Sequence, residues 1–264
     1  MRILKRCWSS MNIAFSMYSK IPAAQCDWSE ENMKYVMCFF PWVGIVIGLL
    51  VFGWDQLAAF LNVRDALRNA VLLVIPVAVT GGIHLDGFLD TSDAMSSWRP
   101  MEKRLEILKD SHAGAFAIIC GIVYFFLLYG VLDSVQGDMV AVYACCFAVS
   151  RSFSAFSVVT FPKASAKGTV AGFSKTAETR VIQATSICYI LLTGGIMLLL
   201  QPVYGVAALL GAVLSFIWYY HRAMKYFGGI NGDLAGYFLT VCELVMPLMI
   251  VIAPQLFTAV QFFL

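Results

Sequence analysis

The chain has 264 residues, of which 60% are hydrophobic and only 13% are charged. In soluble domains roughly a quarter of the residues are charged. This composition therefore excludes an ordinary soluble protein and predicts an all-α, polytopic integral membrane protein. The formal net charge of +2 is too small to indicate nucleic-acid binding. The eight cysteines show no CxxC or Cys/His ligand spacing, and we interpret them as small apolar side chains.

The N-terminal segment, residues 1–34, mixes polar and apolar residues and carries five basic ones. This pattern predicts an amphipathic lead-in on the cytoplasmic face, within one membrane-embedded domain that covers residues 1–264. The apolar runs that follow predict six to seven spans, each near the roughly 20 residues needed to cross a bilayer. The expected spans are 35–61, a second that follows a turn at 62–68 and ends near Gly82, and then 113–132, 139–160, 180–201, 203–221 and 234–254, the last of which the apolar tail to Leu264 could extend.

The connections between these spans differ sharply in their content of lysine and arginine. Fifteen of the 18 basic residues fall on one side, in residues 1–34, 84–112, 163–180 and 222–225, and only 2 fall on the other. Basic connections stay in the cytoplasm. The asymmetry therefore predicts a cytoplasmic N-terminus, cytoplasmic active-site loops and a C-terminus outside.

Residues 81–114, GGIHLDGFLDTSDAMSSWRPMEKRLEILKDSHAG, hold six acidic residues between long apolar runs. Asp86, Asp90 and Asp93 are spaced i, i+4 and i+7, so a helix would place the three carboxylates on one face. Such a stripe is usually a solvated face in a soluble protein, but clustered charge beside a membrane span is more often functional. Oxygen ligands suit Mg2+ or Mn2+ better than zinc, and Mg2+ takes further ligands from substrate phosphates. The stripe therefore predicts a Mg2+ site for a phosphate-bearing substrate.

Further candidates flank this stripe. His84 could act as a base or a ligand, although a lone histidine at a helix end is more often structural. The segment that follows offers basic groups for a phosphate, together with an acidic one: Lys103, Arg104, Lys109 and Asp110. Opposite charges interleave there, so a surface helix held by ion pairs is an equal alternative.

Two later loops on the same expected face also bear on the site. The first, FPKASAKGTVAGFSK, combines small residues with Lys163 and Lys167 and could wrap a phosphate, or it could be an ordinary positive-inside loop. The second, FGGINGDLAG, contains Asp233 just before a span. Asp233 either caps that helix or adds a carboxylate to the site.

Two charged residues fall within the expected spans. Arg151 and Glu243 each lie about nine residues from the estimated cytoplasmic ends of their helices, and therefore at similar depth. An unpaired charge is costly inside a membrane. We therefore predict that the two side chains pair, as structural or substrate-positioning groups.

Several motifs resemble those of the cobalamin synthase family, the adenosylcobinamide-GDP ribazoletransferases. They are GGIHLDGFLDTSDA at 81–94, KRLEILKDSHAGAF at 103–116, GGINGDLAG at 228–236 and YSKIP at 18–22. The resemblance implies a multi-pass, Mg2+-dependent enzyme of the bacterial or archaeal cytoplasmic (inner) membrane. It would join adenosylcobinamide-GDP to α-ribazole, or to α-ribazole 5'-phosphate, and release GMP.

This resemblance implies roles for the candidates already described. Metal held by Asp86, Asp90 and Asp93 would bridge phosphate oxygens, and one of these carboxylates or His84 would take the hydroxyl proton. The expected substrate and phosphate contacts are Lys103, Arg104, Lys109, Asp110, Lys163, Lys167 and Asp233.

Two other classes of protein share part of this pattern. A CDP-alcohol phosphotransferase-like enzyme would use similar chemistry, but its longer DGxxAR pattern is absent because Gly87 is followed by FLDT. A secondary transporter would place charged groups near the bilayer midplane, where only Arg151 and Glu243 fit. The sequence leaves open whether the chain forms a homo-oligomer.

Overall fold

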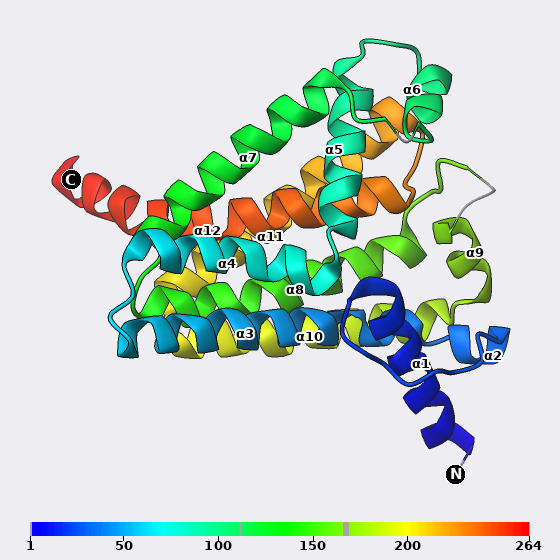
Figure 1. Ribbon diagram of the computed structural model, residues 1–264, viewed down its shortest axis with the longest axis horizontal. Helices are drawn as coiled ribbons and strands as arrows, with labels where there is room; N and C mark the ends of the chain where they lie inside the picture. Colours follow the sequence, from blue (N-terminus) through cyan, green and yellow to red (C-terminus); the bar gives the residue numbers. More distant parts are fainter. Residues whose placement is uncertain (1, 111, 166–168, 264) are drawn as a thin grey trace.

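The structure is a computed structural model that describes residues 2–110, 112–165 and 169–263. Within these ranges the chain is built from helices, most of which run along the long axis of the molecule (Figure 1). The elements are α1 (Arg2–Tyr18), α2 (Glu30–Met33), a 3-10 helix η1 (Val36–Phe39), α3 (Phe40–Phe60), α4 (Asp65–Thr80), α5 (Ile83–Ser96), α6 (Met101–Ile107), α7 (Ala115–Ser134), α8 (Asp138–Thr160), α9 (Thr169–Thr176), α10 (Thr179–Leu200), α11 (Pro202–Phe227) and α12 (Gly232–Phe263).

The described residues contain six helices long and apolar enough to cross a membrane, or seven spans if α4 and α5 count as one bent span. This finding confirms the predicted all-α class and the six to seven spans. The boundaries agree within a few residues in most cases: the span expected at 139–160 is α8, Asp138–Thr160. The largest differences are at two C-terminal ends: α11 continues to Phe227 beyond residue 221, and α12 continues to Phe263 beyond residue 254.

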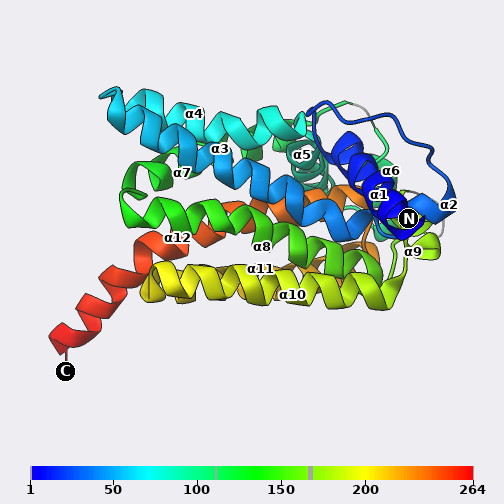
Figure 2. The same cartoon turned by 90° about the horizontal axis from the view of Figure 1, so that it is seen from below.

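The chain turns sharply between α4 and α5. The two helices meet at 95°, and the turn consists of Gly81 at φ 66° and Gly82 at φ 82°. Glycine adopts these left-handed angles without the steric cost that a side chain would bring. α5 therefore runs across the bundle in Figure 1 and is seen end-on in Figure 2, so it does not continue the direction of α4.

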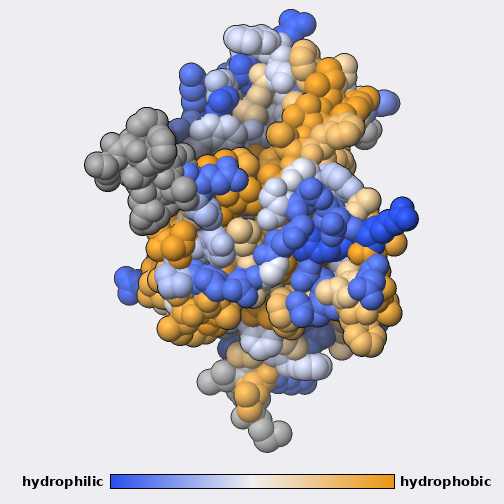
Figure 3. Space-filling view, turned by 90° about the vertical axis from the view of Figure 1, so that its left-hand side faces the viewer, coloured by the Kyte–Doolittle hydropathy of each residue, from blue (hydrophilic) through white to orange (hydrophobic). Residues whose placement is uncertain are grey.

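The outer surface of the bundle is apolar. Large side chains point outward from the long helices, including Phe126 on α7, which is 76% exposed, Leu191 on α10 and Leu49 on α3. Hydrophilic side chains gather instead at the end of the bundle seen in Figure 3, between apolar flanks. This distribution fits a molecule whose sides contact lipid and whose ends contact water.

The predicted pairing of Arg151 with Glu243 is confirmed. Arg151 on α8 has no exposed surface, and its Nη1 lies 2.6 Å from Oε1 of Glu243 on α12. Ser150 donates a further hydrogen bond of 2.8 Å to the same oxygen. The two charges therefore neutralise each other between the helices, which accounts for them without a transport pathway.

A second buried ion pair lies at the far end of the bundle and was not predicted. Arg68 on α4 lies 2.6 Å from Asp55 on α3, and it also donates to the carbonyl oxygens of Leu132 and Val135. These bonds tie the α3–α4 turn to the end of α7. They fix α4, which in turn fixes the starting point of α5.

Candidate active site

The acidic stripe is helical, as predicted. Asp86, Asp90 and Asp93 all lie on α5; Asp86 is exposed, and the other two are half-buried. α5 packs across the first turns of α12, because each helix presents a glycine at the crossing. A Cβ atom at Gly87 would lie 2.7 Å from the carbonyl oxygen of Asp233, and one at Gly236 would lie 2.9 Å from that of His84. The close crossing brings α12 and its Asp233 against the stripe.

Asp233 adds a carboxylate to the site and does not cap its helix. The cap comes from Asn231, whose Oδ1 accepts a hydrogen bond of 2.9 Å from the backbone N–H of Leu234. The Nδ2 of Asn231 donates to Oδ2 of Asp233, also at 2.9 Å. Asn231 therefore satisfies the start of α12 and orients the Asp233 carboxylate. Of the two alternatives drawn from the sequence, the structure supports the second.

The four carboxylates of Asp86, Asp90, Asp93 and Asp233, here called the acidic cluster, influence one another. Burial, followed by the charges of Asp86, Asp233 and Asp93, raises the pKa of Asp90 from 3.8 to about 6. Among the described residues, none of the four has a lysine or arginine within ion-pair distance. The acidic cluster is therefore a concentration of negative charge that a cation would stabilise.

The donor set suits a divalent cation that is shared with a substrate. Within the described part of the chain, no three His, Cys, Asp or Glu side chains converge in an arrangement ready to hold a metal. Mg2+ does not need such a cage, because it is usually held by one or two carboxylates together with water and substrate phosphates. The acidic cluster meets that requirement with exposed and half-buried oxygen ligands.

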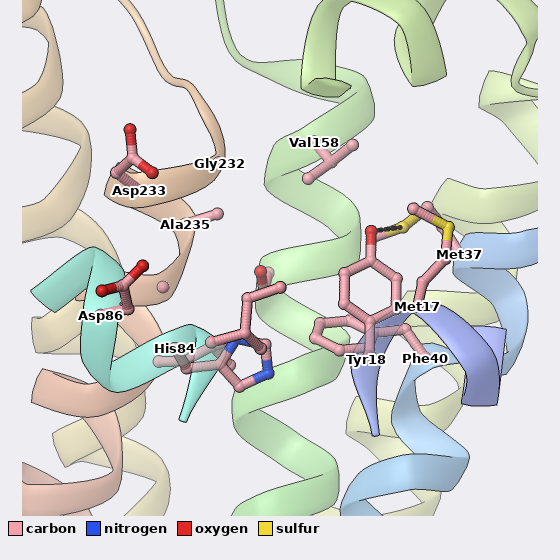
Figure 4. A pocket seen from close by; sticks show the side chains of 14 residues that line it. Met17, Tyr18, Met37, Phe40, His84, Asp86, Val158, Gly232, Asp233 and Ala235 are labelled. Carbon is pink, nitrogen blue, oxygen red and sulfur yellow. Dashed lines mark hydrogen bonds between the residues drawn. The ribbon is translucent and has the colours of Figure 1, made fainter. Parts of the chain in front are cut away.

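A cavity of about 220 Å³ opens beside the acidic cluster (Figure 4). Asp86 and Asp233 lie on one side of it, and Tyr18 and Phe40 lie on the other. His84 also lines the cavity, with its ring centroid 5.7 Å from that of Phe40, and its Nε2 has no hydrogen-bond partner among the described residues. His84 thus adjoins the acidic cluster without a hydrogen bond to it. Tyr18 and Phe40 were not predicted as site residues, although Tyr18 begins the YSKIP motif.

The basic residues of the 103–110 segment lie on and just after α6; Lys103 and Lys109 are exposed, and Arg104 is half-buried. Lys103 pairs with Glu106 at 2.8 Å, and Asp110 accepts a hydrogen bond of 3.0 Å from the backbone N–H of His112. Arg104 lies over the ring of Tyr226, 4.7 Å from its centroid. The surface helix is therefore present with the ion pair between Lys103 and Glu106, and phosphate binding by Lys103, Arg104, Lys109 and Asp110 stays a prediction.

The two later loops lie side by side, so Lys163 lies next to the loop that leads to Asp233. Ile230 donates to the carbonyl oxygen of Pro162 at 2.8 Å, and Ala164 donates back to Ile230 at 3.0 Å. Lys163, between them, is half-buried and donates to the carbonyl oxygen of Phe161; burial lowers its pKa. Lys167 lies outside the described residues.

The eight cysteines are all free, in agreement with their interpretation as apolar side chains.

Comparisons with known proteins identify the family of the chain. A family model described as cobalamin-5-phosphate synthase matches residues 10–251. A relative from Lachnoclostridium phytofermentans, named adenosylcobinamide-GDP ribazoletransferase, is 45% identical over 245 residues, which cover 93% of this chain and 94% of that protein. A relative of the same name from Clostridium botulinum strain Alaska E43 is 32% identical over 246 residues, or 92% and 96% of the two chains. No solved structure matches the chain. Because the family model covers most of its length, the chain belongs to the cobalamin-5-phosphate synthase family.

Proposed function

We propose that this chain joins adenosylcobinamide-GDP to α-ribazole, or to α-ribazole 5'-phosphate, and releases GMP. The family and the name shared by its relatives support these substrates. The structural observation that carries the proposal is the acidic cluster where α5 crosses α12, next to a cavity of about 220 Å³. Carboxylates that have no basic partners among the described residues, beside a space for a substrate, suit metal-assisted transfer between phosphate groups.

In the proposed reaction, a hydroxyl oxygen of ribazole forms a bond to the phosphorus attached to cobinamide. The bond between that phosphorus and the oxygen of GMP breaks, and GMP leaves. Asp86, Asp90 and Asp93 would hold Mg2+, which supplies charge neutralisation on the phosphate oxygens. The hydroxyl proton passes to one of these carboxylates or to His84, whose Nε2 is unpartnered among the described residues.

The remaining residues would hold the diphosphate. A hollow of about 770 Å³ on α6 is lined by Arg99, Lys103 and Asp110 among others. Lys163 lies against the 228–233 loop, where its backbone runs beside Ile230. Basic groups thus come from two segments, and we assign the phosphate contacts to Lys103, Arg104, Lys109, Lys163 and Lys167, together with Asp110 and Asp233.

We also propose that the chain spans the inner membrane of a bacterial or archaeal cell. The end of the bundle that carries the acidic cluster would face the cytoplasm. The support is the count of 15 basic residues in the connections on this side against 2 on the other. A cytoplasmic site would meet a nucleotide-activated substrate directly.

The test is the release of GMP from adenosylcobinamide-GDP by the purified protein in detergent, with α-ribazole and Mg2+ added separately and together. The proposal predicts that GMP appears only when both are present, in equal amount with the cobalamin product. GMP without the acceptor would indicate hydrolysis. A folded protein that releases no GMP would contradict the proposed reaction and favour a CDP-alcohol substrate.

A further inference from the structure

The cavity beside the acidic cluster has two unlike walls. One wall carries the carboxylates of Asp86 and Asp233, and Asp86 is exposed, so this end is reachable from solution. The opposite wall consists of aromatic and thioether side chains, among them Tyr18, Phe40 and Met37 (Figure 4). A ligand that fills the cavity must therefore be polar at one end and apolar at the other.

The apolar wall offers flat ring surfaces and few free polar groups. The ring centroids of Tyr18 and Phe40 lie 4.4 Å apart. The ring of His84 is the third of the group, with its centroid 5.7 Å from that of Phe40. The hydroxyl of Tyr18 donates to the sulfur of Met37 at 3.6 Å, so it is engaged within the protein. Aromatic and methionine side chains arranged in this way favour a flat, apolar ring system.

The size of the cavity selects between the two substrates. About 220 Å³ is below the roughly 300–1,000 Å³ typical of pockets for drug-sized ligands. A corrin macrocycle is far too large for this space, whereas a bicyclic aromatic base fits in it. Ribose attached to such a base would then extend toward Asp86 and Asp233, where the acceptor hydroxyl is needed.

We propose that this cavity is the acceptor site, and that it holds the aromatic base of α-ribazole between Tyr18, Phe40 and Val158 while the ribose points to the acidic cluster. The inference rests on the proposed function, because it assigns one of the two substrates of that reaction to a position. It also makes the N-terminal helix α1, which supplies Tyr18, part of the substrate site. Adenosylcobinamide-GDP then approaches from the exposed side of the acidic cluster.

The experiment compares steady-state kinetics of the full chain in detergent for the wild type, Val158→Phe and a matched control, Val123→Phe. Val158 lines the cavity and is 4% exposed, whereas Val123 lies on the outer face of α7 and is 50% exposed. A phenyl group at position 158 should fill the cavity and raise KM for α-ribazole at least about tenfold, the factor expected when stacking of a base is lost. KM for adenosylcobinamide-GDP should change by less than about twofold, and Val123→Phe should behave as the wild type.

A second variant, Val158→Ala, tests the proposal even if Val158→Phe does not fold. Val158→Ala enlarges the cavity. It should therefore lower the ratio of the KM for an acceptor with a tricyclic base to the KM for α-ribazole. An unchanged KM for α-ribazole in folded Val158→Phe, or an unchanged preference in Val158→Ala, would overturn the acceptor site while leaving the proposed function in place. If the wild type itself transfers nothing, the proposed function fails and the acceptor site fails with it.

Discussion

Asp90 should destabilise the metal-free protein at neutral pH. Its pKa is raised from 3.8 to about 6, mainly by burial and then by the charges of Asp86, Asp233 and Asp93. A carboxyl group with a raised pKa binds its proton more tightly in the folded than in the unfolded chain. Stability therefore falls as the pH rises from about 4 to 6, and the loss is complete above pH 6.

The size of this effect follows from the pKa shift. About 2 pH units correspond to about 3 kcal/mol at 1.36 kcal/mol per unit, and partial exposure of Asp90 to solvent reduces this to about 1–2 kcal/mol. The neutral side chain of Asp90→Asn avoids the cost. We expect this variant to melt about 2–6 °C above the wild type at pH 7.5 in EDTA, with the difference vanishing near pH 4.

The assay is thermal unfolding in detergent, in EDTA and then in Mg2+, with Asp27→Asn as the matched control. Asp27 is exposed in the segment before α2, so its variant should melt with the wild type. Mg2+ should stabilise the wild type more than Asp90→Asn, because the cation neutralises the acidic cluster. A melting temperature for Asp90→Asn equal to or below that of the wild type in EDTA above pH 6 would refute this reasoning.

Three further predictions concern the pairing, the helix crossing and pH. Glu243→Gln should lower the free energy of unfolding by about 3–5 kcal/mol, because Arg151 is left buried and unpaired. Arg151→Met combined with Glu243→Leu should restore most of the lost stability, as measured by chemical denaturation. Gly236→Ala should force α12 away from α5 and lower kcat at least about tenfold, whereas Gly195→Ala, with no neighbour within 4 Å, should leave the rate unchanged. A rate-versus-pH series at limiting Mg2+ should fall below about pH 6 as Asp90 gains a proton, and saturating Mg2+ should move the fall to lower pH; an acid limb that ignores Mg2+ would count against metal binding by the acidic cluster.

Much of the helical framework could be predicted because a membrane span leaves a strong signal in sequence. An apolar run near 20 residues has few other structures available to it, so the boundaries of α8 and α10 were placed within one residue of those observed. The same reasoning paired Arg151 with Glu243, since two opposite charges at the same depth in the membrane are costly unless they pair.

The direction of a helix leaves no such signal. The apolar run that ends near Gly82 was expected to be a full span, yet α4 has 16 residues and the chain then turns by 95° into α5. Gly81 and Gly82 permit the turn, but the buried Arg68 and the crossing at Gly236 decide where α5 goes. Those contacts join residues far apart in the sequence.

The same limit applies to the site. The stripe on α5 could be predicted because its spacing is local, but the neighbours of the stripe come from elsewhere in the chain. Tyr18 and Phe40 reach the cavity from α1 and α3, and only the short motif around Tyr18 hinted at their part. Asn231 caps α12 and so leaves Asp233 free to join the acidic cluster, a choice that the sequence left open.

The most direct test of the account is the rate of GMP release as a function of Mg2+ concentration for the wild type, Asp86→Asn and Asp27→Asn. Asp86 belongs to the acidic cluster and lines the cavity, whereas Asp27 lies in the segment before α2. We predict that Asp86→Asn lowers kcat at least about a hundredfold and requires more Mg2+ for half its maximal rate, while Asp27→Asn matches the wild type. A folded Asp86→Asn protein with a rate within about twofold of the wild type at limiting Mg2+ would contradict the account.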